Sequence, residues 1–257
     1  MRGFCMSALA VLCAMAVAAP PASGPASRPA TRPTTAPAER NVAVEKTSQG
    51  DLLVQPINHS AVRFAFKGKQ YYVDPSGKAE WDKMPKADAI FITHEHRDHL
   101  DPKAVGHIRK ADTVIYASAA AVRKAGFGRV IEVGQTKRVL DITVQAVPAY
   151  NLTPDRVRFH PKSRKDNGYV LTFADKRVYV AGDTEGTEEM KALKDIDIAF
   201  LPCNLPYTMT PEAAAEAARA FKPKIIYPYH QGKSDPAKVK KLLADVKEIE
   251  VRVLPLP

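Results

Sequence analysis

The sequence feature that most limits the possible folds is an apolar run that ends abruptly in a group of histidines. Residues 87–94, ADAIFITH, are mostly apolar up to His94, as is typical of a β-strand that is buried on both faces. Such a strand needs a further layer on each side, which favours a layered α/β protein. The stretch 92–101, ITHEHRDHLD, contains three of the seven histidines of the chain. Because clustered polar side chains need partners when they are buried, we expect a functional site where this strand ends.

The segments around this strand alternate between strand and helix patterns. Before it, three short runs rich in β-branched and aromatic residues predict an antiparallel meander. After it, strands alternate with helices, and we therefore expect an α/β (α+β) protein with two mixed β-sheets packed face to face and helices outside, a four-layer αββα sandwich. The expected strands are 52–58, 61–68, 70–75, 87–94, 113–118, 129–133, 168–173, 177–184, 196–202, 224–230 and 248–255, with a hairpin in 138–147; the expected helices begin at 102, 119, 188, 210 and 235.

The first 44 residues differ in composition from the rest of the chain. Residues 1–19 combine an early arginine, a short apolar stretch and then small residues, which is the pattern of a secretory signal peptide. The apolar stretch is shorter than the roughly 20 residues of a membrane span, although an uncleaved anchor is the alternative. Residues 20–44 are rich in Pro, Ala and Thr and predict a disordered tether. We expect an exported protein, periplasmic or extracellular, with one folded domain at 45–257 and no stable membrane insertion after cleavage.

Charge and cysteine content narrow the function further. The formal net charge is +10, of which +7 lies after Arg40, and this balance favours an anionic small-molecule substrate. The basic residues are scattered and no nucleic-acid-binding motif accompanies them, so we do not expect nucleic acid as a partner. Cys203 is the only cysteine after the predicted signal peptide. An internal disulfide is therefore impossible in the mature chain, and stability must come from the core and any bound metal.

The histidine-rich stretch has the spacing of a metal site. His94, His96, Asp98 and His99 form the pattern H-x-H-x-D-H. Alternate residues of an extended segment project to the same side, so His94 and His96 can point together, and a helix capped by Asp101 follows. Imidazole nitrogen and carboxylate oxygen are ligands that zinc prefers. A chance cluster on a surface loop is the alternative, but this spacing at the end of a strand favours metal binding.

Together with AGDT at 181–184 and YPYH at 227–230, this pattern resembles the metallo-β-lactamase superfamily. The resemblance extends from about Leu52 to the end of the chain, and the three motifs occur in the order that the family has. It implies the metallo-β-lactamase fold, a metal-dependent hydrolase and two divalent metal ions, zinc in the first place and manganese or iron as alternatives. It further implies that His94 and His96 bind one ion, that Asp98, His99 and His230 bind the other, and that Asp183 lies between them.

One ligand of the family pattern is missing from its usual place. Many members have a further histidine directly after the strand that ends here in VPAYN, where this chain has Tyr150 and Asn151. The pattern AYN…FHP resembles a single-domain branch related to L-ascorbate 6-phosphate lactonases. On this resemblance we expect His160 to fold back and complete the first site, because a site that lacks a ligand holds its metal weakly. In the alternative, His160 faces solvent, and water or Asn151 completes the site.

Several residues are candidates for supporting roles in catalysis. The resemblance implies that Asp98 binds metal and also orients the nucleophile. Protonation of the leaving group needs a donor, for which Tyr150, Tyr229 and His59 are candidates. His59 could equally contact the substrate or form a structural hydrogen bond. Asp74, in VDP, is expected to support the metal-binding loop and not to bind metal, with a plain turn residue as the alternative.

The substrate class is less constrained than the metal site. The segment 151–167 contains five cations and could form a lid for an anionic substrate, although a solvated basic loop explains them equally well. The resemblance favours an ester, a lactone or a phosphodiester over a β-lactam. A di-iron redox protein commonly replaces the second histidine of the motif by glutamate, whereas this chain has His96; a non-catalytic metal-binding module is the other alternative. The sequence does not predict the oligomeric state. The five cations are Arg156, Arg158, Lys162, Arg164 and Lys165.

Overall fold

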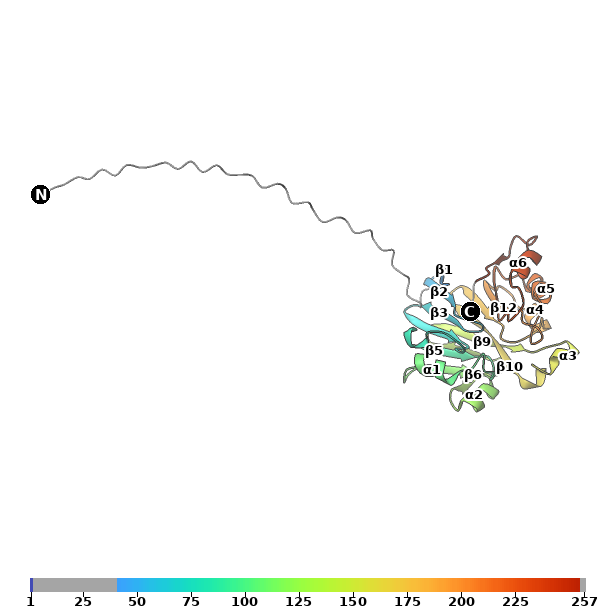
Figure 1. Cartoon of the computed structure of the whole chain (residues 1–257), viewed down its shortest axis with the longest axis horizontal. Coiled ribbons are helices and arrows are strands. Elements are labelled where there is room, and N and C mark those ends of the chain that lie inside the picture. Colours follow the sequence, from blue (N-terminus) through green and yellow to red (C-terminus); the bar gives the residue numbers. More distant parts are fainter. Residues whose placement is uncertain (2–40, 255–257) are drawn as a thin grey trace. The chain divides into compact units, whose positions relative to one another are not determined.

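The computed structural model describes Met1 and residues 41–254, and residues 43–251 form two β-sheets with helices on their outer faces (Figure 1). The expected signal peptide, 1–19, and most of the expected tether, 20–44, lie outside the described residues. The first strand begins at Ala43, so the folded part starts two residues earlier than the expected boundary at 45. Within the described residues, no helix is both long enough and apolar enough to cross a membrane.

The first sheet has seven strands in the order of the sequence. Its first four strands form an antiparallel meander, and the next three add to it in parallel through helical connections. The meander confirms the expected strands before residue 87, but β1 had not been expected. The strands are β1 (Ala43–Thr47), β2 (Gly50–Pro56), β3 (Val62–Phe66), β4 (Lys69–Val73), β5 (Ala89–Ile92), β6 (Val114–Ala117) and β7 (Arg129–Val130).

The second sheet repeats this plan with its own seven strands. Strands β8 to β11 are antiparallel, and β11 to β14 are parallel. Each half of the domain is thus a meander followed by parallel strands, and the expected hairpin in 138–147 is part of the second meander. The strands are β8 (Thr136–Val139), β9 (Ile142–Ala149), β10 (Asp166–Phe173), β11 (Lys176–Val180), β12 (Ile198–Pro202), β13 (Ile225–Tyr229) and β14 (Glu250–Val251).

The four layers are confirmed by the way the apolar side chains divide. Between the sheets, Phe64 of β3 packs against Phe173 of β10 at 5.4 Å and against Phe200 of β12 at 6.2 Å between ring centroids. On the outer face of the first sheet, Ile90 and Ile92 of β5 pack with α1 and α2. The outer face of the second sheet packs with α4, α5 and α6. Strand β5 is therefore buried on both faces, as its apolar run predicts.

The helices begin where the sequence places capping residues. Asp101, Ser118, Thr187 and Thr210 each accept a hydrogen bond from a backbone N–H of the first turn, which satisfies a group that has no partner within the helix. The helices are η2 (Trp81–Lys83), α1 (Pro102–Ile108), α2 (Ala119–Ala125), α3 (Pro154–Val157), η3 (Lys162–Arg164), α4 (Glu188–Lys191), α5 (Pro211–Phe221) and α6 (Ala237–Leu242).

The main differences from the expected elements lie at the edges of the sheets. The strands expected at 129–133 and 248–255 are reduced to β7 and β14, which are two residues long each. Both are edge strands with one hydrogen-bonded neighbour, so only part of each β-rich run finds a partner. The helix expected from 235 is also shorter and covers Ala237–Leu242.

Candidate metal centre

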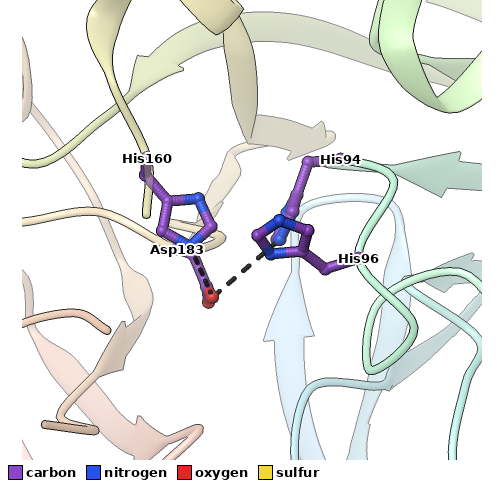
Figure 2. A group of neighbouring side chains, drawn as sticks. All are labelled: His94, His96, His160 and Asp183. Carbon is purple, nitrogen blue, oxygen red and sulfur yellow. Dashed lines mark ion pairs between the residues drawn. The ribbon is translucent and has the colours of Figure 1, made fainter. Parts of the chain in front are cut away.

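The carboxyl-terminal ends of strands from both sheets, together with the connection between β9 and β10, bring seven side chains together. Four of them, His94, His96, His160 and Asp183, form a first cluster, and Asp98, His99, Asp183 and His230 form a second. In each cluster the potential ligand atoms lie within 4.8 Å of one another, and Asp183 belongs to both. Figure 2 shows the first cluster, with Asp183 between His160 and the loop of His94 and His96. The structure therefore groups these residues as the sequence resemblance implies.

The loop after β5 supplies four of the seven side chains because its backbone turns tightly. The N–H groups of His99 and Leu100 both donate to the carbonyl oxygen of His96, at 3.0 and 2.8 Å. This turn brings Asp98 and His99 to the second cluster, while His94 and His96 stay with the first. Helix α1 then starts behind its Asp101 cap.

Asp74 binds both ends of this loop, Thr93 and His99, as its expected supporting role requires. Its Oδ1 accepts a hydrogen bond from the backbone N–H of Thr93 at 2.7 Å, and its Oδ2 lies 2.8 Å from Nδ1 of His99. Asp74 and His99 are both fully buried. A carboxylate at Nδ1 holds the proton there, so Nε2 of His99 is free to face the cluster.

His160 reaches the first cluster from the long connection between β9 and β10, and it does not face solvent. Its side chain is buried, its Nε2 lies 3.2 Å from Oδ2 of Asp183, and its Nδ1 lies 3.3 Å from Oδ2 of Asp166. The backbone N–H of Asn151 donates to the carbonyl oxygen of His160 at 2.8 Å, which closes the segment into a loop. The side-chain amide of Asn151 donates to the carbonyl oxygens of Arg156 and Tyr207.

The Arg164 guanidinium joins the two loops that provide the first cluster. It donates to Oε2 of Glu95 at 2.9 Å and to Oδ2 of Asp166 at 3.0 Å, and its Nη1 lies 2.9 Å from Nε2 of His96. Asp166 also contacts His160, so Arg164 contacts one cluster histidine, His96, directly and a second, His160, through Asp166. The sequence pattern did not assign this role to Arg164 or Asp166, since both contacts depend on how the segment folds.

Asp183 is the centre of the site. Its Oδ1 lies 3.1 Å from Nε2 of His99 and 3.2 Å from Nε2 of His230, whereas its Oδ2 faces His160 and, at 3.9 Å, Nε2 of His94. Each oxygen thus faces one cluster. Burial alone would raise the pKa of Asp183, but His230 and His99 hold it well below its usual value, so the carboxyl group is ionised.

The turn that carries Asp183 needs the glycine of the AGDT motif. Gly182 has φ +66°, and a Cβ there would lie 2.9 Å from the carbonyl oxygen of Asn167 and 3.1 Å from Cβ of Thr93. A larger residue would push the turn away from β5 and its histidines. The hydroxyl oxygen of Tyr229 accepts the Gly182 N–H at 2.9 Å, so Tyr229 holds the turn from within the core.

Charge and hydrogen bonding indicate that the site is built for cations. Nε2 of His94, Nε2 of His99 and Oδ1 of Asp183 are buried, and among the described residues no hydrogen bond of good geometry reaches them, although His99 and Asp183 form an ion pair at 3.1 Å. Unsatisfied buried polar atoms are costly, and divalent ions would satisfy all three. The first cluster offers three imidazoles and one carboxylate, and the second two of each, which are ligand sets that suit zinc and related metals.

The pKa values of the imidazoles differ within the site. Burial, reinforced by the nearby His99, lowers the pKa of His94 well below 6.5. Burial also opposes the charged form of His99, but the carboxylates of Asp183 and Asp74 outweigh it and raise the pKa of His99 well above 6.5. In the first cluster, Asp166 and Asp183 outweigh burial in the same way and raise the pKa of His160. Without metal, one ring of each cluster, His99 or His160, therefore favours the charged form beside the buried carboxylates.

His59 lies beside the second cluster. Its ring centroid is 3.9 Å from that of His230, its Nε2 is 3.8 Å from Oδ2 of Asp98, and its carbonyl oxygen accepts the His230 N–H at 2.8 Å. The structural hydrogen bond is therefore made by the backbone of His59, whereas its imidazole, 31% exposed, lies beside Asp98, and contact with a substrate stays a prediction. Burial and the neighbouring His230 lower the pKa of His59 to about 4, so its side chain is neutral at pH 7.

The structure does not bring the hydroxyl group of Tyr150 to either cluster. This group donates to Oε2 of Glu189 at 2.7 Å and accepts a hydrogen bond from Nζ of Lys162 at 3.1 Å. Tyr150 contributes through its backbone, because its carbonyl oxygen accepts the N–H of Glu185 at 3.0 Å and thereby fixes the chain after Asp183. Its predicted part in proton transfer has no support from these contacts.

Most of the expected cationic lid is neutralised by acids that the sequence analysis had not connected with it. Arg156 pairs with Glu185 at 2.6 Å, Lys162 pairs with Glu189 at 3.0 Å, and Arg164 pairs with Glu95 and Asp166. Among the described residues, no ion pair joins the two remaining cations, Arg158 and Lys165, to an acid. The attraction of this segment for an anion therefore rests on two side chains and not on five.

Comparisons with known proteins find relatives along most of the chain. Residues 54–230 match the model of the β-lactamase superfamily domain. A relative from Koribacter versatilis, named a UPF0173 metal-dependent hydrolase, is 34% identical over 184 residues, which are 65% of this chain and 78% of that protein. A crystal structure of a putative metal-dependent hydrolase from Parabacteroides distasonis has 47% sequence identity and a TM-score of 0.81 and covers 84% of this chain and 99% of its own.

The fold is shared with a protein of different chemistry. The structure of CmlA, a di-iron β-hydroxylase from Streptomyces venezuelae, has a TM-score of 0.60 at 20% identity and covers 82% of this chain and 54% of its own. Because function resides in the site and not in the fold, this likeness supports the architecture alone.

Proposed function

The chain belongs to the β-lactamase superfamily as a metal-dependent hydrolase, and we propose that it holds two divalent ions, zinc in the first place, and cleaves an ester, lactone or phosphodiester bond. The position of Asp183 carries this proposal, because its two oxygens each face one cluster of imidazoles. A carboxylate shared in this way suits a pair of ions, because an ion at each oxygen would balance the charge of a carboxylate that is buried among imidazoles.

Two bound ions would supply a hydroxide nucleophile near neutral pH and stabilise the negative charge that develops on the attacked group. Asp98 is the accessible carboxylate of the site, with its side chain 48% exposed. Although burial favours its neutral form, the hydrogen bond from His230 and the nearby His99 lower its pKa, so Asp98 stays ionised. It can therefore accept a hydrogen bond from an incoming water molecule and orient it.

His59 suits substrate contact better than proton donation. With a pKa lowered to about 4, it has no extra proton to give at pH 7, but its neutral ring can hydrogen-bond to the substrate at the edge of the second cluster. The donor for the leaving group is then water or the substrate itself. Arg158 and Lys165 and the net positive charge of the domain support a small anionic substrate.

We also propose export to a periplasmic or extracellular space. The signal-peptide pattern at 1–19 supports it. After the predicted signal peptide the chain has one cysteine, the buried Cys203, so it does not need a reducing compartment to keep its thiols free. Zinc binding by histidine and carboxylate ligands is compatible with an oxidising compartment.

Elemental analysis and a substrate panel test the proposed function. Protein loaded with zinc, manganese or iron is assayed on a phenyl ester, a simple lactone and bis(p-nitrophenyl) phosphate, with and without chelator, together with Asp183→Asn. We expect two ions per chain and hydrolysis of at least one substrate that chelator and the substitution abolish. Hydrolysis that survives chelation would contradict the mechanism, and two irons with a visible absorption band and no hydrolysis would favour a di-iron redox protein.

A further inference from the structure

We propose that the substrate is an amphiphile whose apolar group packs against a preformed apolar rim beside the metal centre. The apolar rim consists of Leu152, Phe159, Leu205 and Tyr207. The inference deepens the proposed function and rests on it, because it assigns the part of the substrate that flanks the cleaved bond.

The rim gathers large apolar side chains that are unusually exposed. Leu152, Leu205 and Tyr207 have exposed fractions of 50%, 43% and 45%, and among the described residues few other large apolar side chains reach such values. They lie on two loops, 151–159 and 203–208, that meet where the rings of Phe159 and Tyr207 pack edge to face at 4.9 Å. Grouped exposed apolar side chains commonly mark a binding surface.

Both loops connect directly to cluster histidines. Phe159 precedes His160, and the backbone N–H of Asn151 donates to the carbonyl oxygen of His160 at 2.8 Å. Nδ2 of Asn204, which precedes Leu205, lies 3.5 Å from Nδ1 of His230. Each loop of the rim thus contacts one cluster histidine, His160 or His230, and we infer from this that a group packed on the rim lies next to the place where the bond is cleaved.

Buried polar residues hold the rim in its exposed position. The side chain of Glu185, 5% exposed, accepts hydrogen bonds from the backbone N–H groups of Leu152 and Thr153, both at 2.6 Å, and from Arg156. On the other loop, the backbone N–H of Asn204 donates to the hydroxyl group of the buried Thr208 at 2.9 Å. The loops are thus fixed before a ligand arrives, which lowers the entropy lost on binding.

The other side of the site is polar, which makes the preference amphiphilic. The loop of His94 and His96 approaches Asp183 from the side away from His160 (Figure 2). That loop presents Arg97 and Asp98 to solvent, and His59 lies beside Asp98. A substrate that spans the centre would therefore meet Arg97 and Asp98 at one end and the apolar rim at the other, where Arg158 lies 4.8 Å from the ring centroid of Phe159.

Chain-length dependence tests the inference directly. The affinity of the zinc-loaded full chain for n-alkylphosphonates of two, four, six and eight carbons is measured by calorimetry. These compounds contain no bond that the proposed reaction cleaves, so the experiment measures binding separately from hydrolysis. Full burial of a methylene group would strengthen binding about fourfold, and on a half-open rim we expect about twofold per methylene. Leu152→Ser and Tyr207→Ser should reduce this slope and leave the two-carbon compound unaffected.

Leu140→Ser is the matched control, because Leu140 is 40% exposed but lies in the turn between β8 and β9. Its slope should equal that of the unaltered protein. Equal affinity at all chain lengths, or no binding at eight carbons, would overturn the inference, as would an equal loss of slope in Leu140→Ser. Light scattering tests whether a second copy of the chain covers the rim instead of a substrate. If Tyr207→Ser converts a dimer into a monomer, the rim is a subunit interface and the inference is overturned. If affinity still rises with chain length but no substrate is hydrolysed, the proposed hydrolase function is rejected, whereas the rim as a binding surface is supported.

Discussion

At the scale of single residues, a buried carboxylate behind the ring sets the direction of two of the five cluster imidazoles, His99 and His160. Nδ1 of His99 is held by Asp74 at 2.8 Å, and Nδ1 of His160 lies 3.3 Å from Asp166. Both carboxylates are buried and stand on the far side of the ring from Asp183. They turn Nε2 of each ring toward the cluster, which is the orientation that a metal ligand needs.

Asp74→Asn should weaken metal binding at the second cluster selectively. The oxygen of asparagine can replace only one of the two Asp74 oxygens, so either Thr93 loses its acceptor or an amide N–H faces Nδ1 of His99. In the second case Nδ1 of His99 must accept a hydrogen bond from the amide. The ring proton then moves to Nε2, which is the atom that should bind the ion. We expect about a 10- to 100-fold loss of zinc affinity for one of the two ions, measured by competition with a zinc-binding dye.

Asp88→Asn provides the control for that experiment. Asp88 is a largely buried carboxylate with its own hydrogen bonds, to the backbone of Gln70 and to Lys110, but it belongs to neither cluster. Its replacement should leave both zinc affinities unaltered. If Asp88→Asn and Asp74→Asn lose zinc to the same extent, the effect comes from general destabilisation and not from the orientation of His99.

Zinc uptake should release a proton and strengthen as the pH rises. In the metal-free protein, Asp183 and Asp74 outweigh burial and raise the pKa of His99 well above 6.5, so its ring is charged at pH 7. An ion binds the neutral ring only and must displace this proton. Calorimetry in buffers of different ionisation enthalpy should therefore show about one proton released for the ion at the second cluster, in addition to any proton that His160, whose pKa is also raised, gives up at the first; affinity at the second cluster should rise about tenfold per pH unit while His99 remains protonated. Buffer-independent heats would contradict the protonated state of His99.

At the scale of elements, the sequence predicted what depends on short-range pattern. The burial of β5 on both faces, the helix start at Asp101 and the grouping of the strand-terminal ligands all follow from apolar runs, capping residues and motif order. The fold-back of His160 was predicted from the pattern FHP. The family resemblance implies that a further histidine completes the first site, and local propensity alone does not contain this information.

What the sequence did not predict depends on pairing between distant segments. The edge strands β7 and β14 are shorter than their β-rich runs because only two residues of each pair with a neighbour. The hydroxyl group of Tyr150 contacts Glu189, and Arg164 contacts Glu95, across 39 and 69 positions of the chain. A basic loop and a salt-bridged loop have the same composition, so the sequence could not distinguish a free cationic lid from a neutralised one.

The segment 151–165 yields an element-scale prediction. Arg164→Ala should lower zinc affinity at the first cluster by about 10- to 100-fold, because it removes the contact that holds His96 and Asp166 in place. The positive charge itself repels the ion little, since Glu95 and Asp166 neutralise it. Arg156→Ala is the matched control: Arg156 lies in the same segment and pairs with the buried Glu185, but it contacts no cluster residue. An equal loss of zinc in both variants would mean that loop order alone matters.

At the scale of the whole molecule, the metal centre joins the two halves of the domain. His94, His96, Asp98 and His99 follow β5 of the first sheet, whereas Asp183 and His230 follow β11 and β13 of the second. The sheets are otherwise held by the apolar layer between them, and no disulfide links them in the described residues. Ions that take ligands from both halves should therefore stabilise the complete domain against unfolding.

Zinc should raise the thermal midpoint of unfolding substantially. At a free concentration one hundred times the dissociation constant, each bound ion adds about 2.7 kcal/mol to the free energy of unfolding, which corresponds to about 5–10 °C for a domain of this size. Calorimetric scans of metal-free and zinc-loaded protein measure the shift. Asp183→Asn should remove most of it, because each cluster loses its shared ligand, and the same zinc concentration should then leave the midpoint nearly unaltered. A midpoint that zinc does not change in the unaltered protein would show that the clusters hold no ion in the folded state, because any ion bound only to that state must stabilise it.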